Sequence, residues 1–89
     1  INIHPSLLPK YGGKGMYGHF VHEAVHAAHE VESGITIHWV NEHYDEGAII
    51  AQYRTDILEG DSVADIERKV RGLEMEWFPH VLKEVLTSC

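Results

Sequence analysis

The 89-residue sequence predicts an α/β fold with four parts in order: the end of a strand, a helix, an antiparallel pair of strands, and a long kinked C-terminal helix. Two stretches of the chain repeat apolar residues at helical spacing. Between them lie two runs rich in β-branched and aromatic residues, joined by a short polar turn that is typical of antiparallel strands. These observations indicate a helix-covered sheet.

The composition fits one small soluble unit. There are 14 acidic and 7 basic residues, and the net charge of -7 argues against binding to nucleic acid or to an anionic membrane surface. The longest apolar stretches fall far short of the roughly 20 residues that span a bilayer. A single cysteine, Cys89, forms no internal disulfide, so we expect a reducing compartment and the cytoplasm.

The first element reads as the end of a strand that has lost its start. Residues 1–3 run directly into a polar segment marked by Pro5 and Pro9, and four glycines at 12, 13, 15 and 18 then form a loop. A complete domain seldom opens in mid-element. We therefore expect a longer native protein, with residues 1–89 as its C-terminal portion.

A helix is expected from residue 19 to about residue 32, ended by Gly34. Its apolar arc contains Val21, Ala24, Val25, Ala27, Ala28 and Val31. The opposite face carries four histidines: His19, His22, His26 and His29. A zinc site draws three or four ligands from more than one element, whereas this stripe offers only neighbouring pairs. We favour a solvated histidine face over a metal site and expect no metal.

Two strands follow, over residues 35–40 and from residue 48 to about 57. A last helix is expected from about Val63, with Ser62 and Asp65 as a capping box and a kink or interruption at Pro79. Its apolar stripe contains Ile66, Val70, Leu73, Trp77, Val81 and Val85. Four further side chains are expected in the core or packed between strands: His38, Trp39, Tyr53 and Phe78.

Three polar residues at strand ends could carry chemistry. Asn2 and His4 flank Ile3, so in an extended segment their side chains point the same way. Asp45 lies in the turn between the two strands, and Gly47 nearby permits close approach of a ligand. An amide and a charged imidazole suit the oxyanion of an amine attacking a carbonyl, and a carboxylate keeps the histidine charged. On spacing alone, turn and capping roles for Asn2 and His4 are the more common outcome, and catalysis is the alternative.

Several segments in order resemble the folate-dependent formyltransferases. They are Asn-Ile-His-Pro-Ser-Leu-Leu-Pro at 2–9, Thr-Ile-His-Trp-Val at 36–40 and Asp-Glu-Gly-Ala-Ile-Ile-Ala-Gln at 45–52. The glycine-rich segment 10–18 resembles the phosphoribosylglycinamide formyltransferases within that superfamily. Methionyl-tRNA formyltransferase and formyltetrahydrofolate deformylase stay as alternatives, as does a non-catalytic acidic interaction module.

The resemblance implies a Rossmann-like domain and a role for each matching residue. Asn2 would orient the formyl group, His4 would be the general acid and oxyanion stabiliser, and Asp45 would keep His4 charged. The co-substrate 10-formyltetrahydrofolate would bind to Asn2 and to the turn Asn41, Glu42, His43, Tyr44 and Asp45. Glycinamide ribonucleotide would lie against Arg71, Gly72, Leu73 and Glu74, with Glu74 accepting from the ribose hydroxyls.

The family's glycine-rich phosphate-binding loop has no counterpart in residues 1–89. We therefore expect this piece to hold the catalytic trio without being active alone. The expected partners are small-molecule substrates, and we also expect self-association or association with the missing N-terminal half, because a strand edge would otherwise be exposed.

Overall fold

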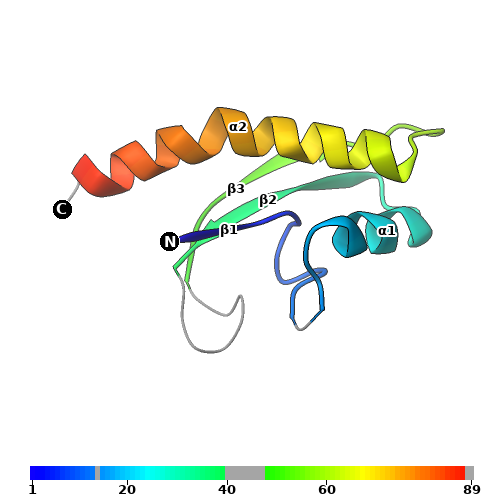
Figure 1. Cartoon of the computed structure of the whole chain (residues 1–89), viewed down its shortest axis with the longest axis horizontal. Helices are drawn as coiled ribbons and strands as arrows, with labels where there is room; N and C mark the ends of the chain where they lie inside the picture. The colour runs from blue at the N-terminus through cyan, green and yellow to red at the C-terminus, as the bar shows by residue number, and fades with distance from the viewer. Residues whose placement is uncertain (14, 40–47, 88–89) are drawn as a thin grey trace.

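The computed structural model describes residues 1–13, 15–39 and 48–87. Within these residues, five elements follow one another: β1 (Asn2–His4), α1 (His19–Ala27), β2 (Glu32–His38), β3 (Ile49–Asp56) and α2 (Val63–Thr87). Figure 1 shows α2 running along the length of the molecule beside the strands, with α1 at one end of the sheet. None of the described helices is long and apolar enough to cross a membrane.

The three strands form one sheet in the order β1-β2-β3, and both pairings are antiparallel. The predicted antiparallel strand pair is therefore confirmed. Asn2 lies opposite His38 and His4 opposite Thr36, so β2 is the central strand and directly supports the segment with the candidate catalytic residues. A parallel neighbour for β1, expected from an α/β domain, is not among the described strands.

Gly34 lies inside β2, and our prediction that it ends a helix was wrong. A Cβ at this position would collide with the backbone carbonyl oxygen of Tyr53 on β3 and would stand 2.8 Å from a methyl carbon of Leu7. The glycine is therefore required by close packing of backbone and side chain within the sheet.

Helix α1 is shorter than predicted because His29 adopts a left-handed conformation, with φ of 56°. The amide of Ala28 donates to the carbonyl of Ala24, and the amide of His29 donates to that of His26, which closes the last turn. Val31, assigned by the sequence to the apolar arc, lies beyond this end and is 76% exposed.

The core forms where both helices meet β2. Its fully buried apolar members are Val21, Val25, Ile35, Ile37, Ile66, Val70 and Val81. The remaining members of the predicted α2 stripe, Leu73, Trp77 and Val85, pack against this cluster. The helical spacing of apolar residues thus predicted correctly which side of α2 faces the sheet.

Helix α2 begins with the predicted capping box. The Ser62 hydroxyl accepts from the Asp65 amide at 3.1 Å, and the Asp65 carboxylate accepts from the Ser62 amide at 3.0 Å. The helix continues through Pro79 to Thr87, so the predicted interruption does not occur. Figure 1 shows the orange part of α2 changing direction gently.

The aromatic residues divide between the core and the surface. Trp77 stacks on Tyr53 with ring centroids 4.3 Å apart, and both rings pack against the core together with Phe78. His38 is buried, as predicted. Trp39 is 47% exposed, so its assignment to the core was wrong: it lies just beyond the end of β2, whose last six residues are all buried.

Candidate functional site

A cleft with a volume of about 600 Å³ brings together the predicted residues from opposite ends of the chain. Asn2 and His4 reach it from β1, and Glu74 reaches it from the middle of α2. The glycine-rich loop provides another wall with Gly13, Gly15, Met16, Tyr17 and Gly18. An amide, an imidazole and a carboxylate therefore line one cavity next to a loop with little side-chain bulk.

The imidazole of His4 is held in place by a backbone contact. The residue is 4% exposed, and its Nε2 lies 2.7 Å from the carbonyl oxygen of Tyr11. A carbonyl can only accept, so Nε2 carries a hydrogen and donates it. This contact fixes the orientation of the ring where it lines the cleft.

The segment after His4 is anchored to the sheet by the buried hydroxyl of Thr36. This hydroxyl donates to the carbonyl of Ser6 at 2.7 Å and accepts from the amide of Leu8 at 2.9 Å. The side-chain amide of Gln52 on β3 donates to the same hydroxyl and to the carbonyl of Leu8. The segment that follows His4 is thereby bonded to side chains of both β2 and β3.

A smaller cavity of about 160 Å³ adjoins the cleft, and Pro5, Gly18 and Glu74 line both. Its other walls are His22 from α1 and two residues of α2, Glu67 and Arg71. The carboxylate of Glu74 therefore stands where the two cavities meet. Burial raises the pKa of Glu74, and the nearby Arg71 guanidinium partly opposes that rise.

His22 contradicts the prediction of a solvated histidine face. It is 3% exposed, because α1 packs against α2 and turns this position toward Glu67 and Arg71. Burial lowers the pKa of His22, while the Glu67 carboxylate acts in the opposite direction. Among residues 1–13, 15–39 and 48–87, no three or more His, Cys, Asp or Glu side chains are grouped to hold a metal ion.

The other predicted site residues have different outcomes. Arg71 lines the smaller cavity, whereas Gly72 is exposed and Leu73 packs against the core. The predicted folate-contacting turn falls outside the described residues: Asn41, Glu42, His43, Tyr44 and Asp45. The catalytic assignment of Asp45 therefore stays a prediction.

Sequence reasoning missed Tyr11 and Thr36, which hold His4 and its segment. Thr36 offered one signal, since it is a hydroxyl residue between Ile35 and Ile37 in a strand otherwise rich in apolar side chains. A buried hydroxyl in such a strand needs hydrogen-bond partners. The role of Tyr11 depends on its main-chain carbonyl, which no side-chain pattern reveals.

Comparison with known proteins gives relatives for nearly the whole chain. It is 46% identical over 82 residues to the chloroplastic phosphoribosylglycinamide formyltransferase of Vigna unguiculata, covering 92% of this chain and 26% of that protein. It is 43% identical over 86 residues to the phosphoribosylglycinamide formyltransferase of Bacillus subtilis, covering 97% of this chain and 42% of the relative. The chain thus spans less than half the length of these relatives.

Among solved structures, phosphoribosylglycinamide formyltransferase from Bacillus halodurans superposes with a TM-score of 0.84 at 36% identity. The match covers 96% of this chain and 41% of that structure. The sequence pattern of the family described as Formyl transferase matches residues 1–82. The order of the elements, the position of Asn2 and His4 and this match lead to one conclusion: the chain belongs to the formyl transferase family.

Proposed function

We propose that this chain forms the catalytic part of an enzyme that transfers a formyl group from 10-formyltetrahydrofolate to the amine of glycinamide ribonucleotide. The observation that carries the proposal is the convergence of Asn2, His4 and Glu74 on one cleft of about 600 Å³. The printed names of the relatives support the choice of reaction. Because the chain covers less than half of these relatives, it would act as one portion of a longer formyltransferase domain.

Each side chain has a defined task in this proposal. Asn2 donates from its side-chain amide to the formyl oxygen, and the charged ring of His4 stabilises the negative charge that develops there. The amine forms a bond to the formyl carbon, and the bond from that carbon to N10 of the folate then breaks. Asp45 helps to carry the proton lost by the amine toward N10, which leaves as an N–H group.

Glu74 is the residue that we assign to recognition of the second substrate, glycinamide ribonucleotide. We assign it to the ribose hydroxyls of glycinamide ribonucleotide, since a carboxylate accepts from two adjacent hydroxyl groups. Its partial burial strengthens such bonds, and Arg71 nearby helps to keep it ionised. The turn at 41–45 is assigned to the folate.

The proposed partners are small molecules in the cytoplasm. We also propose that the chain associates with itself or with the remaining part of a formyltransferase domain. β1 lies at the edge of the described sheet, and an edge strand offers unpaired backbone groups to a further strand.

A chimeric enzyme tests the proposal directly. The 86 matching residues of this chain would replace the corresponding segment of the Bacillus subtilis relative, to which they are 43% identical. We expect formyl transfer from 10-formyltetrahydrofolate to glycinamide ribonucleotide. In this chimera, His4→Ala should lower kcat by roughly 10²- to 10⁴-fold with little change in KM, as expected for loss of a general acid that stabilises the oxyanion.

Two further measurements make this experiment decisive. His80→Ala changes an exposed histidine on α2 and should leave kcat within about twofold, since surface changes away from a site have small effects. Glu74→Gln should raise KM for glycinamide ribonucleotide more than KM for the folate. A folded chimera that formylates methionyl-tRNA and not the ribonucleotide would overturn the proposed acceptor.

A further inference from the structure

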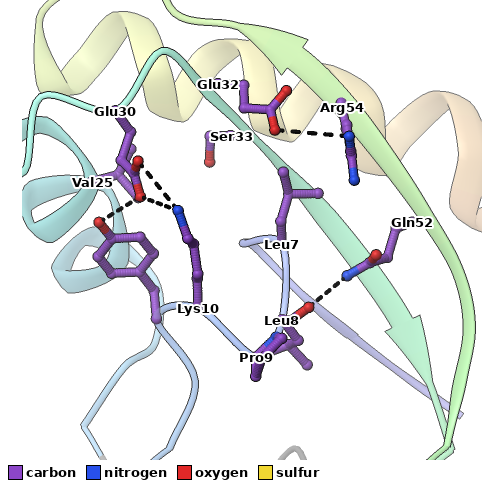
Figure 2. Close-up of a pocket in the computed structure, with 11 residues that line it drawn as sticks. Leu7, Leu8, Pro9, Lys10, Val25, Glu30, Glu32, Ser33, Gln52 and Arg54 are labelled. Atoms are coloured by element: carbon purple, nitrogen blue, oxygen red, sulfur yellow. Dashed lines mark hydrogen bonds and ion pairs between the residues drawn. The ribbon is translucent and has the colours of Figure 1, made fainter.

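A separate cavity of about 240 Å³ lies beside segment 7–11, and none of the described residues lines both this cavity and the catalytic cleft. Figure 2 shows its walls, which are formed by Leu7 and Leu8 of segment 7–11, Val25 of α1, Ser33 of β2 and Gln52 of β3. The cavity therefore combines apolar walls with polar groups from both strands. Its size suits a ligand smaller than a typical drug molecule.

Ser33 supplies the first indication of a ligand. Its side chain is on the cavity wall, the residue is 3% exposed, and its Oγ has no hydrogen-bond partner within the described part of the chain. A buried polar atom without a partner costs about 1 to 3 kcal/mol. A molecule in the cavity that donates to this oxygen or accepts from it would remove that cost.

The charges around the cavity provide the second indication. Figure 2 shows Lys10 paired with Glu30 on one side and Arg54 facing Glu32 on the other. These are two cations and two anions, so the rim carries no net formal charge. A ligand that brings equal positive and negative charge leaves this balance intact, whereas a simple anion or cation does not.

The two ion pairs differ in how many hydrogen-bonding groups they leave available to a ligand. Glu30 accepts from Lys10 at 3.2 Å and from the Tyr11 hydroxyl at 2.8 Å, and these bonds, the tyrosine first, lower the pKa of Glu30. Arg54 and Glu32 stand 3.8 Å apart, beyond ordinary hydrogen-bond distance, and both side chains are substantially exposed. The guanidinium and carboxylate of this second pair therefore remain available to a ligand.

We propose that this cavity binds a free α-amino acid with a small apolar side chain. The amino acid's carboxylate pairs with Arg54 and its ammonium group with Glu32. One end of this head group also hydrogen-bonds to the Ser33 hydroxyl. The apolar side chain contacts Leu7 and Val25, where its burial adds to the affinity.

Tyr11 connects this cavity with the candidate catalytic histidine. Its hydroxyl donates to Glu30 on the cavity wall, and its carbonyl accepts from His4 Nε2. A ligand in the cavity changes the surroundings of Glu30 and Tyr11, which both line it, and so changes the environment of the residue that holds His4. The NMR signals of the His4 ring should respond to occupancy even though His4 does not line the cavity.

Binding is tested with the full 89-residue chain, using L-valine as the probe in calorimetry and in ¹⁵N-¹H NMR titration. We expect saturable binding in the millimolar range, with amide shifts at Ser33, Glu30 and Gln52. Isovalerate lacks the ammonium group and valinamide lacks the carboxylate, so each should bind at least about tenfold more weakly. The readout is independent of formyl transfer and so remains valid if the proposed reaction is wrong.

Variants identify the site. Ser33→Ala and Arg54→Gln should each weaken L-valine binding about tenfold, as expected for loss of one bond to a charged head group. The matched control Arg68→Gln removes an exposed guanidinium on α2 and should leave binding unchanged. No saturable binding, equal binding of isovalerate, or shifts centred on Asn2 and Glu74 would each overturn the proposal.

Discussion

The imidazole of His4 donates to the main-chain carbonyl of Tyr11, seven positions further along the chain, at 2.7 Å. Tyr11 has a φ of 57°, a left-handed conformation that is uncommon for a residue other than glycine. The side chain of the same residue is held by Glu30 at 2.8 Å. The carbonyl is thus fixed from both sides, and the ring of His4 is oriented before any substrate arrives.

The loss of stability of the folded chain at low pH should depend in part on protonation of Glu30. Its pKa is lowered by the Tyr11 hydroxyl and by Lys10, so its contribution to stability is present above the pKa of unfolded glutamate and is lost as pH falls through the lower folded value. Tyr11→Phe should raise the pKa of Glu30, measured by ¹³C NMR of its carboxyl carbon. Glu30→Gln should reduce the fall of the urea midpoint with decreasing pH. The exposed Glu76→Gln serves as control, and an equal effect there would contradict the assignment.

Thr36→Val should be strongly destabilising although the two side chains have the same shape. It leaves the Ser6 carbonyl, the Leu8 amide and the Gln52 amide without their shared buried partner. We expect a loss of about 3 kcal/mol in the free energy of unfolding, measured by urea denaturation. Thr87→Val, the same change at an exposed position, should cost less than about 0.5 kcal/mol. Comparable losses for the two variants would show that the buried network adds no stability.

The two tryptophans should differ sharply. Trp77→Ala removes a ring that stacks on Tyr53 and packs against the core, and we expect a loss of about 3 kcal/mol. Trp39→Ala removes a ring that is 47% exposed and should cost less than about 1 kcal/mol. Urea unfolding of both variants at neutral pH provides the comparison, and the reverse order would contradict the packing described.

The start of α2 can be tested at its cap. Ser62→Ala deprives the Asp65 amide of its acceptor and should lower the free energy of unfolding by about 1 kcal/mol. Ser62→Asn retains an acceptor at the cap position and should recover most of that loss. If thermal unfolding gives the alanine and asparagine variants the same stability, a side-chain acceptor at the cap position is not what stabilises the helix end.

Much of the fold follows from periodicities in the sequence. The two-residue spacing of Asn2 and His4 places both at one cleft. The apolar residues from Ile66 to Val85 recur at helical spacing and determine which side of α2 is buried. Such features depend on residues close in sequence, which a repeating pattern can record. The capping box at Ser62 is local for the same reason.

The predictions that failed concern residues whose surroundings depend on contacts between elements far apart in the sequence. The burial of His22 depends on how α1 is turned against α2, and the sequence of α1 alone contains no record of that contact. Thr36 bonds to Ser6 across 30 residues, so its role appears only when β1 and β2 are paired. Asp45 lies outside the described residues, so its catalytic role stays a prediction from the sequence and the family resemblance.

Gly34 has a consequence for variation in this chain. Any other residue there would press its first side-chain carbon against the carbonyl oxygen of Tyr53 and close to Leu7. A main-chain oxygen cannot turn aside as a flexible side chain can, so β2 and β3 would have to separate. Deep mutational scanning should therefore find that position 34 tolerates almost no substitution, and purifying selection would preserve this glycine for its packing alone.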